Sequence, residues 1–290
     1  MKFGSQLQTN WDWRAACNFM FGGTGSALIF IIVLFSFPQT APLMLTILAL
    51  GLVGLGLFMV WLEIGRPWRF LHVFYHPNTS WMTREASVGS ILFPVTIAGA
   101  VLKSTPVLAL AACLGVVFLY CQGRILKAAQ GVPAWRTQSI VPLIMSTGFV
   151  EATGIAIAFA YLTGAQQTWL IPFFSVALIV RAWAWFAYQE RLRKNEAPAG
   201  ALKAFSRIRL NFLLTGIFLP LVFCAIAFAG IYTPVMVLAA GISATYAGWM
   251  LKFTIVVKAA FKQGYGIGKL RKGRPTLKAP VRRHGDPIQY

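Results

Sequence analysis

The chain has 290 residues, of which 58% are hydrophobic and 11% are charged, and its mean hydropathy is +0.68. Soluble domains carry roughly a quarter charged residues, so this composition excludes a soluble globular domain and indicates an integral membrane protein. A net charge of +19 favours a nucleic-acid partner in soluble proteins. Here the basic residues lie between and after apolar runs, which is typical of membrane topology and excludes nucleic acid.

Eight apolar stretches are long enough to cross the hydrocarbon core of a bilayer, which takes about 20 helical residues. In chain order they are Ala16–Phe37, Ala41–Leu62, Ala86–Lys103, Val107–Ile125, Ile140–Leu162, Trp169–Tyr188, Ile208–Ala229 and Pro234–Val257. The sequence therefore predicts an all-α, polytopic membrane protein with eight transmembrane helices, a number that allows two four-helix bundles. We divide it into a transmembrane domain, residues 1–257, and a basic C-terminal tail, residues 258–290.

The charges of the connections are strongly asymmetric. Of the 26 Lys and Arg residues, all but Lys103 fall on one predicted face, which carries both termini and the longer connections. The positive-inside rule makes this face cytoplasmic, with both termini inside. We expect a multi-pass protein of the bacterial cytoplasmic membrane. The basic tail has two interpretations, namely binding to anionic membrane lipids and docking onto an acidic partner subunit.

Cofactor ligands are scarce in this sequence. A transmembrane haem needs histidines that project from helices, but His72 and His76 lie in a connection and His284 lies in the tail. Iron–sulfur and zinc sites need clustered thiolates, and the four cysteines are scattered without C-x-x-C spacing. The prediction is that this chain holds no haem, no iron–sulfur cluster and no metal ligand set.

Three glutamates lie at or within apolar segments, where an ionisable side chain usually faces a cavity, a partner or a proton path. Glu63 ends the second predicted span and Glu85 opens the third, so both lie at one interface, joined by a hairpin rich in Arg, His and Trp. Such a hairpin could bind the polar head of an amphipathic redox carrier, with the two carboxylates exchanging protons.

Simpler interpretations of the same residues stay open. Arg66 could pair with Glu63 at i, i+3, and Glu85 could interact with the positive end of the third helix. Trp68 and Trp81 could be interface anchors. Glu151, half-way along the fifth span, is either part of a proton path or a hydrogen-bond partner between helices.

The hairpin also resembles a known family. Residues Glu63–Pro67 and Ser80–Glu85 resemble the hairpin between the second and third helices of membrane anchor subunits of the dimethyl sulfoxide reductase and NrfD type. Asn18–Gly23 resembles the first-helix patch of that family, and Gly131–Trp135 resembles its connection after the fourth helix. The opening Trp11–Asn18 is similar to membrane subunits of the phenylacetyl-CoA:acceptor oxidoreductase type.

This resemblance implies an eight-helix, haem-free subunit that binds menaquinone or ubiquinone and works only within an oxidoreductase complex. Its implied partners are a four-cluster [4Fe-4S] iron–sulfur subunit and a catalytic subunit carrying molybdenum or tungsten on bis-molybdopterin guanine dinucleotide. The acidic quinol-site position of the family falls on Glu85. A histidine position of the family falls on Glu63, which is a departure, and His72 or His76 could replace it.

Together these observations predict a quinone site with Glu85 and Glu63 as its proton-exchanging, catalytic residues. The predicted quinone-binding residues are Asn18, Glu63, Arg66, His72, Trp81, Arg84 and Glu85. Because the hairpin lies on the basic face, the partners are expected in the cytoplasm, and by analogy the complex oxidises its substrate and reduces quinone, as in anaerobic respiration. The competing hypotheses are a secondary transporter that uses intramembrane carboxylates and a passive anchor.

Overall fold

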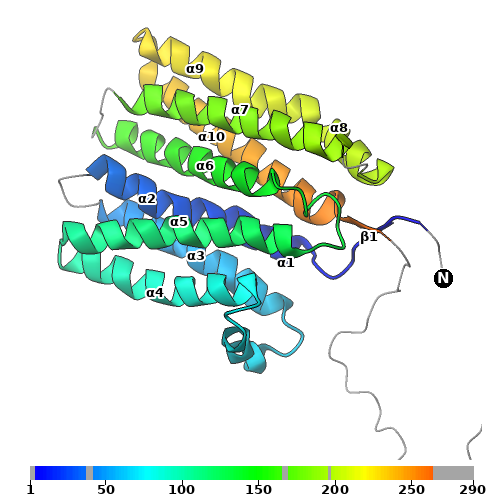
Figure 1. Cartoon of the computed structure of the whole chain (residues 1–290). Helices are drawn as coiled ribbons and strands as arrows, with labels where there is room; N and C mark the ends of the chain where they lie inside the picture. The colour runs from blue at the N-terminus through cyan, green and yellow to red at the C-terminus, as the bar shows by residue number, and fades with distance from the viewer. Residues whose placement is uncertain (1–3, 37–41, 165–168, 195–196, 264–290) are drawn as a thin grey trace, which may run out of the picture.

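The structure, a computed structural model, describes residues 4–36, 42–164, 169–194 and 197–263. The elements in chain order are β1 (Gln6–Leu7), α1 (Trp13–Cys17), η1 (Asn18–Gly22), α2 (Gly23–Ser36), α3 (Leu43–Glu63), η2 (Pro67–Tyr75), α4 (Trp81–Val101), α5 (Thr105–Ala128), α6 (Ile140–Leu162), α7 (Leu170–Lys194), α8 (Ala199–Leu213), η3 (Leu214–Phe218), α9 (Leu219–Phe228), α10 (Thr233–Phe253), η4 (Thr254–Lys258) and β2 (Phe261–Lys262). Segments η1, η3 and η4 are π-helical and η2 is a 3-10 helix. The long helices run side by side, and η2, α1 and β1 lie at one end of them (Figure 1).

Within the described residues, seven helical stretches are long and apolar enough to cross a membrane. They are Trp13–Ser36, Leu43–Glu63, Thr105–Ala128, Ile140–Leu162, Leu170–Lys194, Ala199–Phe228 and Thr233–Lys258. The predicted all-α, multi-pass membrane protein is therefore confirmed. The remaining predicted span corresponds to α4, which has 21 residues but is less apolar than the others because it carries Arg84 and Glu85 near its start.

Two predicted boundaries are wrong. Helix α4 begins at Trp81 rather than Ala86, because Ser80 Oγ accepts a hydrogen bond from Thr83 N and caps the helix. Glu85 therefore lies inside α4 and not at its opening. The predicted sixth and seventh spans, Trp169–Tyr188 and Ile208–Ala229, leave too long a connection between them, since α7 continues to Lys194 and α8 already starts at Ala199. Apolar runs mark only the lipid-facing length of a helix, and polar turns extend it.

The C-terminal tail is described only up to residue 263, so most of the predicted 258–290 segment lies outside the described residues. Its first part is not separate from the helical domain. Residues Lys258 and Thr254 belong to η4, which continues α10, and β2 pairs antiparallel with β1 through Gln6 and Lys262. The predicted domain boundary at 257 therefore falls inside a helical segment.

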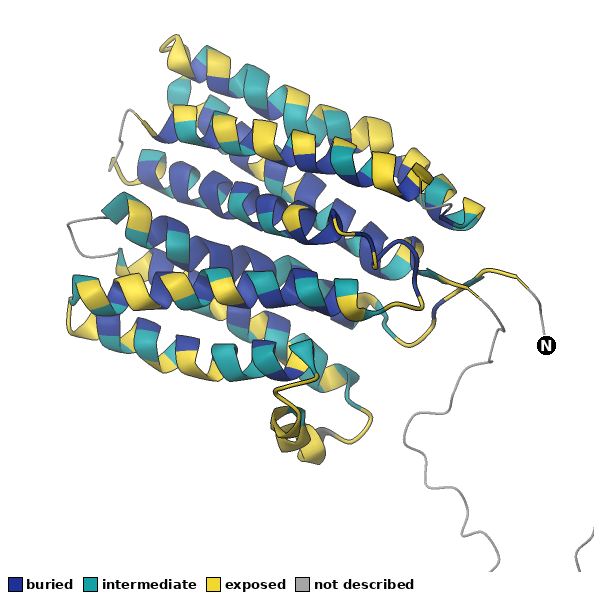
Figure 2. Ribbon diagram, viewed as in Figure 1, coloured by how far each residue is buried: buried dark blue, intermediate teal, exposed yellow. Residues whose placement is uncertain are grey.

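Helix α6 is the centre of the core. In its most apolar window 78% of the residues are buried, against 28% for α3, and it packs against α2, α5, α7 and α10. The outer helices expose large apolar side chains such as Ile47 on α3 and Ile179 on α7. Figure 2 shows this contrast between a buried centre and exposed outer faces. In a bilayer these outer faces contact lipid.

The connection after α5 is anchored to the end of the bundle. Trp135 donates its indole N–H to the carbonyl of Ile255 at 2.8 Å and stacks on Trp11 with ring centroids 5.0 Å apart. The hydroxyl of Tyr188 donates to the carbonyl of Ala134 at 2.7 Å. These contacts hold Trp11, just before α1, against the connection after α5, and they hold that connection against η4 and α7.

Close packing of α2 on α3 gives a first testable prediction. A Cβ atom at Gly25 would lie 2.6 Å from the carbonyl oxygen of Ala49 and 2.8 Å from Val53 N. Because α3 backbone cannot give way easily, Gly25→Ala is expected to destabilise the protein by about 1–3 kcal/mol. Gly51→Ala on α3 is the matched control, since a Cβ there meets no atom within 4 Å. Thermal unfolding in detergent should show a lower midpoint for Gly25→Ala alone, and equal midpoints would contradict this packing.

Candidate functional site

A largely apolar cavity of about 390 Å³ lies between α3, η2 and α4. Aromatic side chains form much of its wall, namely Phe58, Trp61, Phe70, Phe74 and Phe93. The side chains of Glu85 and Ser90 add polar groups from α4. Flat apolar walls with few polar groups are typical of sites for aromatic or isoprenoid ligands.

Glu85 is the best-defined polar group of this cavity. Its side chain is almost fully buried, with 5% exposure, and its Oε1 atom accepts two amide hydrogen bonds. Asn18 Nδ2 donates from η1 at 3.2 Å and Gln122 Nε2 donates from α5 at 3.1 Å. Gln122 Nε2 also lies 3.0 Å from the carbonyl oxygen of Asn18. Three helices thus hold one carboxylate in a fixed position beside the cavity.

Two local features bring Asn18 to Glu85. The first transmembrane stretch changes from α to π geometry over Asn18–Gly22, and such π segments frequently occur at functional sites because they redirect side chains. Glycines then make room for the amide, since a Cβ at Gly22 or Gly56 would lie 3.0 Å from Asn18 Oδ1. The Asn18–Gly23 segment singled out in the sequence therefore supplies both the amide that binds Glu85 and, at Gly22, part of the space for that amide.

Trp81 and Arg84 lie in the first turn of α4, close to Glu85 in sequence but with different contacts. The Arg84 guanidinium donates to the carbonyl of Pro77 at 2.8 Å and to that of Asn78 at 2.7 Å. Its central carbon, Cζ, lies 4.1 Å from the centroid of the Trp81 ring. Arg124 on α5 also lies over the Trp81 ring, at 4.3 Å. These contacts fix the hairpin onto α4 and α5 beside the cavity.

Among the predicted site residues, Glu85 is the one that lines the cavity. Three others lie at the end of α3 and on or next to η2. Glu63 is half-buried at the end of α3, where it interacts electrostatically with Arg14. Arg66 is exposed at the start of η2. His72 is exposed on η2, with Nδ1 3.1 Å from the carbonyl oxygen of Arg69. The structure thus joins Asn18 and Glu85 directly, with Trp81 and Arg84 adjacent in sequence to Glu85. Glu63, Arg66 and His72 are outside the lining of the cavity.

Gln122 was missed by the sequence analysis. It lies within the fourth predicted span, in an apolar run that contains no carboxylate. Because its side chain is not ionisable, it was not among the predicted site residues. An amide at membrane depth is itself a signal, because an unsatisfied polar group in hydrocarbon is unfavourable and such side chains bond across helices.

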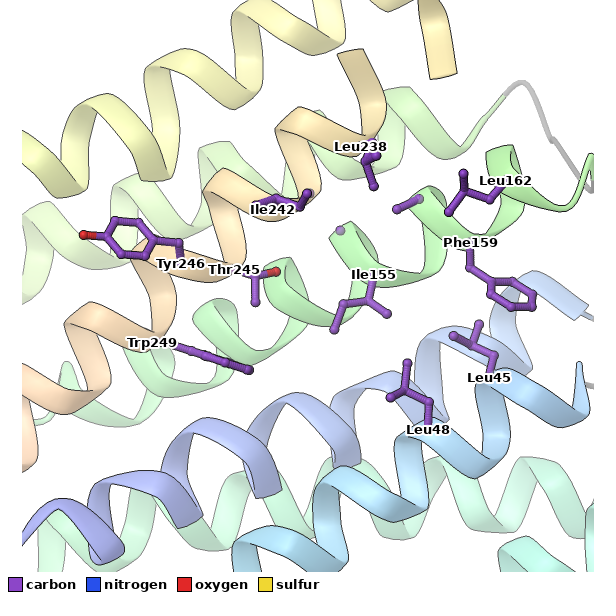
Figure 3. A pocket seen from close by; sticks show the side chains of 13 residues that line it. Leu45, Leu48, Ile155, Phe159, Leu162, Leu238, Ile242, Thr245, Tyr246 and Trp249 are labelled. Carbon is purple, nitrogen blue, oxygen red and sulfur yellow. The ribbon is translucent and has the colours of Figure 1, made fainter. Parts of the chain in front are cut away.

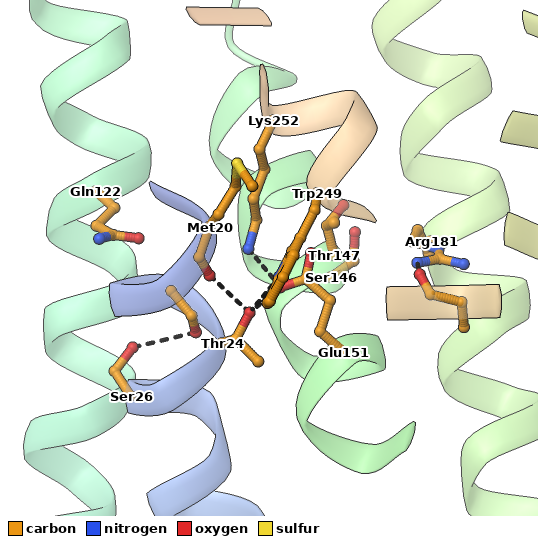
Figure 4. A network of polar contacts seen from close by, with 12 residues as sticks. Met20, Thr24, Ser26, Gln122, Ser146, Thr147, Glu151, Arg181, Trp249 and Lys252 are labelled. Carbon is orange, nitrogen blue, oxygen red and sulfur yellow. Dashed lines mark hydrogen bonds and ion pairs between the residues drawn. The ribbon is translucent and has the colours of Figure 1, made fainter. Parts of the chain in front are cut away.

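A second polar cluster lies deeper in the bundle, around Glu151 on α6. Lys252 Nζ on α10 forms an ion pair with Glu151 Oε2 at 2.6 Å, and both side chains are 0% exposed. Thr24 Oγ1 on α2 donates to the same oxygen at 2.5 Å and accepts from Trp249 Nε1 at 3.1 Å. Figure 4 shows these groups converging from α2, α6 and α10. Of the two interpretations left open, the helix–helix partner describes these contacts directly.

This cluster corrects the charge assignment made from the sequence. Lys252 and Arg181 had been counted on the basic face, but both are fully buried. Arg181 donates to the carbonyls of Ala244 and Gly216 on the neighbouring helices and interacts electrostatically with Glu151. Cations near the end of an apolar run resemble interfacial residues in sequence, and only helix packing reveals that these two face inward.

A separate apolar groove of about 530 Å³ runs along α3, α6 and α10 (Figure 3). Leu45, Ile155 and Ile242 are among the residues that form its walls, and Trp249 lies in it beside the Glu151 cluster. Its lining is almost wholly apolar, which suits a lipid chain.

The described residues thus define a multi-pass helical membrane protein with a buried carboxylate, held by two amides, at the wall of an aromatic cavity. In comparisons with known proteins, no family model matches this sequence and no curated protein matches it significantly.

Proposed function

We propose that this chain is the quinone-reactive membrane subunit of a molybdopterin iron–sulfur oxidoreductase of the NrfD and dimethyl sulfoxide reductase anchor type. The single observation that supports this most is Glu85, a buried carboxylate at the wall of an apolar cavity, bound by Asn18 and Gln122. A quinone requires an apolar, flat enclosure and one group that exchanges protons with its oxygens. Both are present at one place.

The residues have separable tasks in this proposal. The aromatic wall binds the ring and excludes water, and Glu85 holds or releases a proton at the oxygen that faces the cavity. Asn18 and Gln122 orient the carboxylate. Glu63 and His72, outside the lining of the cavity, exchange protons with the aqueous side, while Arg66 and Arg84 add positive charge. Quinone, either menaquinone or ubiquinone, supplies the two-electron, two-proton carrier when bound.

The topology in this proposal has eight spans, namely the seven apolar stretches given above and α4, which is the third span in chain order. The eight spans are arranged as two four-helix bundles. Its support is the length of α4 and its packing against α5 and α3. Both termini lie in the cytoplasm, on the basic face, and the protein resides in the bacterial cytoplasmic membrane. The substrate is oxidised in the cytoplasm and electrons pass to quinone.

The partner surface in this proposal is η2. Trp68 is 90% exposed, and Leu71 and Tyr75 are also exposed there, beside Arg66 and Arg69. An exposed aromatic and basic surface is typical of protein interfaces. A four-cluster iron–sulfur subunit would dock on η2, which brings its nearest cluster close to the cavity, and the molybdenum or tungsten subunit would bind beyond it.

Transport by intramembrane carboxylates gains no support from the ion pair of Glu151. Glu151 Oε2 already accepts from Lys252 and Thr24, and the Lys252 ammonium 2.6 Å away neutralises the carboxylate. A transported cation would have to displace that ammonium. A passive anchor would not need a buried carboxylate beside an aromatic cavity.

Co-purification tests this proposal. The tagged full chain, isolated in mild detergent from cells that express its native neighbours, should co-elute with two soluble subunits, iron, molybdenum or tungsten, and extractable quinone. Trp68→Ala should weaken this co-elution, because it removes an exposed aromatic anchor. Trp183→Ala, equally bulky and 67% exposed on α7, is the matched control and should retain it. A lone chain without metal or quinone would contradict the proposal.

A further inference from the structure

The Glu85 site and the Glu151 cluster are linked through Gln122. The amide nitrogen of Gln122 donates to Glu85 Oε1, as described, which leaves the amide oxygen pointing away from the cavity. A Cβ at Gly23 would lie 2.7 Å from Gln122 Oε1 and 3.0 Å from Lys252 Nζ. The amide oxygen and the ammonium group therefore lie beside the same glycine of α2. Among the described residues Gln122 Oε1 accepts no hydrogen bond, so its interaction with the ammonium is electrostatic and acts through space. Figure 4 shows Gln122 and Lys252 on the two sides of this stretch of α2.

The chemistry of the two groups fits this arrangement. A lysine ammonium has three donors and no acceptor, and the described contacts of Lys252 use one donor, toward Glu151 Oε2. An ammonium attracts the oxygen end of a nearby amide dipole and repels the NH₂ end. Lys252 thus favours the orientation in which Gln122 Nε2 faces Glu85, whereas a reversed amide would direct its oxygen toward the carboxylate.

Glu151 holds the Lys252 ammonium in the position from which it orients the Gln122 amide. Without a carboxylate partner, a buried ammonium is strongly unfavourable. Glu151 binds it at 2.6 Å, and Thr24 fixes the same oxygen from α2. The four groups therefore follow one another in the order Glu151, Lys252, Gln122 and Glu85. An ion pair joins the first two, hydrogen bonding joins the last two, and the interaction of the ammonium with the amide dipole lies between them.

We propose that the Glu151–Lys252 ion pair positions Gln122 and, through it, the Glu85 carboxylate. Lys252 and Gln122 are then positioning residues: they determine which carboxylate oxygen is bound by amides and which faces the cavity. Asn18 and Gln122 both donate to Oε1, so Oε2 is the atom that exchanges the proton. This inference rests on the proposed function for its catalytic consequence, but the contacts themselves can be tested alone.

The test compares three variants of the complex assembled from the full chain and its co-purified partners. Gln122→Leu removes the link, Glu151→Gln/Lys252→Met removes the ion pair without leaving a single buried charge, and the triple variant removes both. The matched control is Glu190→Gln/Lys194→Met, which removes an exposed i, i+4 ion pair on α7. The assay is reduction of decylubiquinone by reduced benzyl viologen, accompanied by infrared difference spectra of the full chain. The carboxyl band of Glu85 is identified by its loss in Glu85→Gln.

Loss of one hydrogen bond to a charged group corresponds to about a tenfold lower rate. Gln122→Leu and the ion-pair variant are each expected to show this loss and a displaced Glu85 band. The triple variant should be no slower than either of the other two, because all three variants interrupt the same series of interactions between Glu151 and Glu85. The control should match wild type. Additive losses in the triple variant, or an unchanged Glu85 band in the ion-pair variant, would overturn the inference.

The two proposals can fail separately. If the wild-type complex does not reduce decylubiquinone, the proposed function fails, and the infrared band then decides the positioning alone. A band displaced by Glu151→Gln/Lys252→Met supports the coupling even then, and an unmoved band overturns it. If wild type is active but the ion-pair variant is equally active with an unmoved band, only the positioning inference fails.

Discussion

Replacement of Glu85 with Gln is expected to lower the rate of decylubiquinone reduction by at least about 100-fold, which is the usual contribution of a positioned acid or base. Glutamine has nearly the same size and can still contact Asn18 and Gln122, but it cannot release or take up a proton. The partner surface proposed on η2 consists of exposed residues and does not include the buried Glu85, so the yield and metal content of the partner subunits should equal those of wild type. The measurement is the turnover of the purified complex at matched subunit composition.

Two further variants make this result specific. Glu190→Gln on the exposed part of α7 removes a carboxylate far from the cavity in sequence and should leave turnover unchanged. Glu63→Gln tests the second predicted carboxylate, which is outside the lining of the cavity. Undiminished turnover in Glu85→Gln would remove Glu85 from the mechanism and, with it, the main support for the quinone site.

The features that could be predicted from the sequence are those that depend on the local composition of the chain. Helical spans follow from apolar runs. The resemblance placed Asn18 and Glu85 in one predicted site, but it did not predict the hydrogen bond between them. The start of α4 could have been found from Ser80, a favourable N-cap residue before a polar first turn. It was missed because the spans were delimited by hydropathy alone.

What the sequence did not predict depends on which helix faces meet. Glu151 and Lys252 are 101 residues apart, and their contact requires α6 and α10 to approach closely. That approach depends on small residues: a Cβ at Gly248 would collide with the Glu151 carboxylate, and one at Gly241 would collide with the backbone of Gly154. Glycines in apolar runs indicate close helix packing, but one sequence does not reveal which pair they join.

The same contact explains why a charge count misassigned two cations. Lys and Arg near a helix end normally extend to the interface with their long side chains. Lys252 and Arg181 instead point into the bundle, where a carboxylate and backbone carbonyls bind them. The remaining basic residues still give the strong asymmetry on which the proposed cytoplasmic orientation rests.

The largest expected effect on stability comes from breaking this buried ion pair on one side only. Lys252→Met leaves the Glu151 carboxylate in the core without its cation, and removal of one partner of a buried pair typically destabilises a protein by about 3–5 kcal/mol. Glu151→Gln/Lys252→Met removes both charges while keeping similar volumes, so most of the lost stability should return. Thr24 can still donate to the amide oxygen of the new glutamine. The measurement is the free energy of unfolding in mixed micelles.

The exposed pair on α7 provides the control for this comparison. Glu190 and Lys194 lie 3.3 Å apart with side chains more than half exposed, and surface pairs of this kind contribute at most about 1 kcal/mol. Lys194→Met should therefore unfold almost like wild type. If Lys252→Met were equally mild, Glu151 would have to be neutralised by a proton or by the nearby Arg181 guanidinium, and Lys252 would not be the group that stabilises its charge. If the double variant were as unstable as Lys252→Met alone, the loss would come from packing around the lysine stem and not from the unpaired carboxylate.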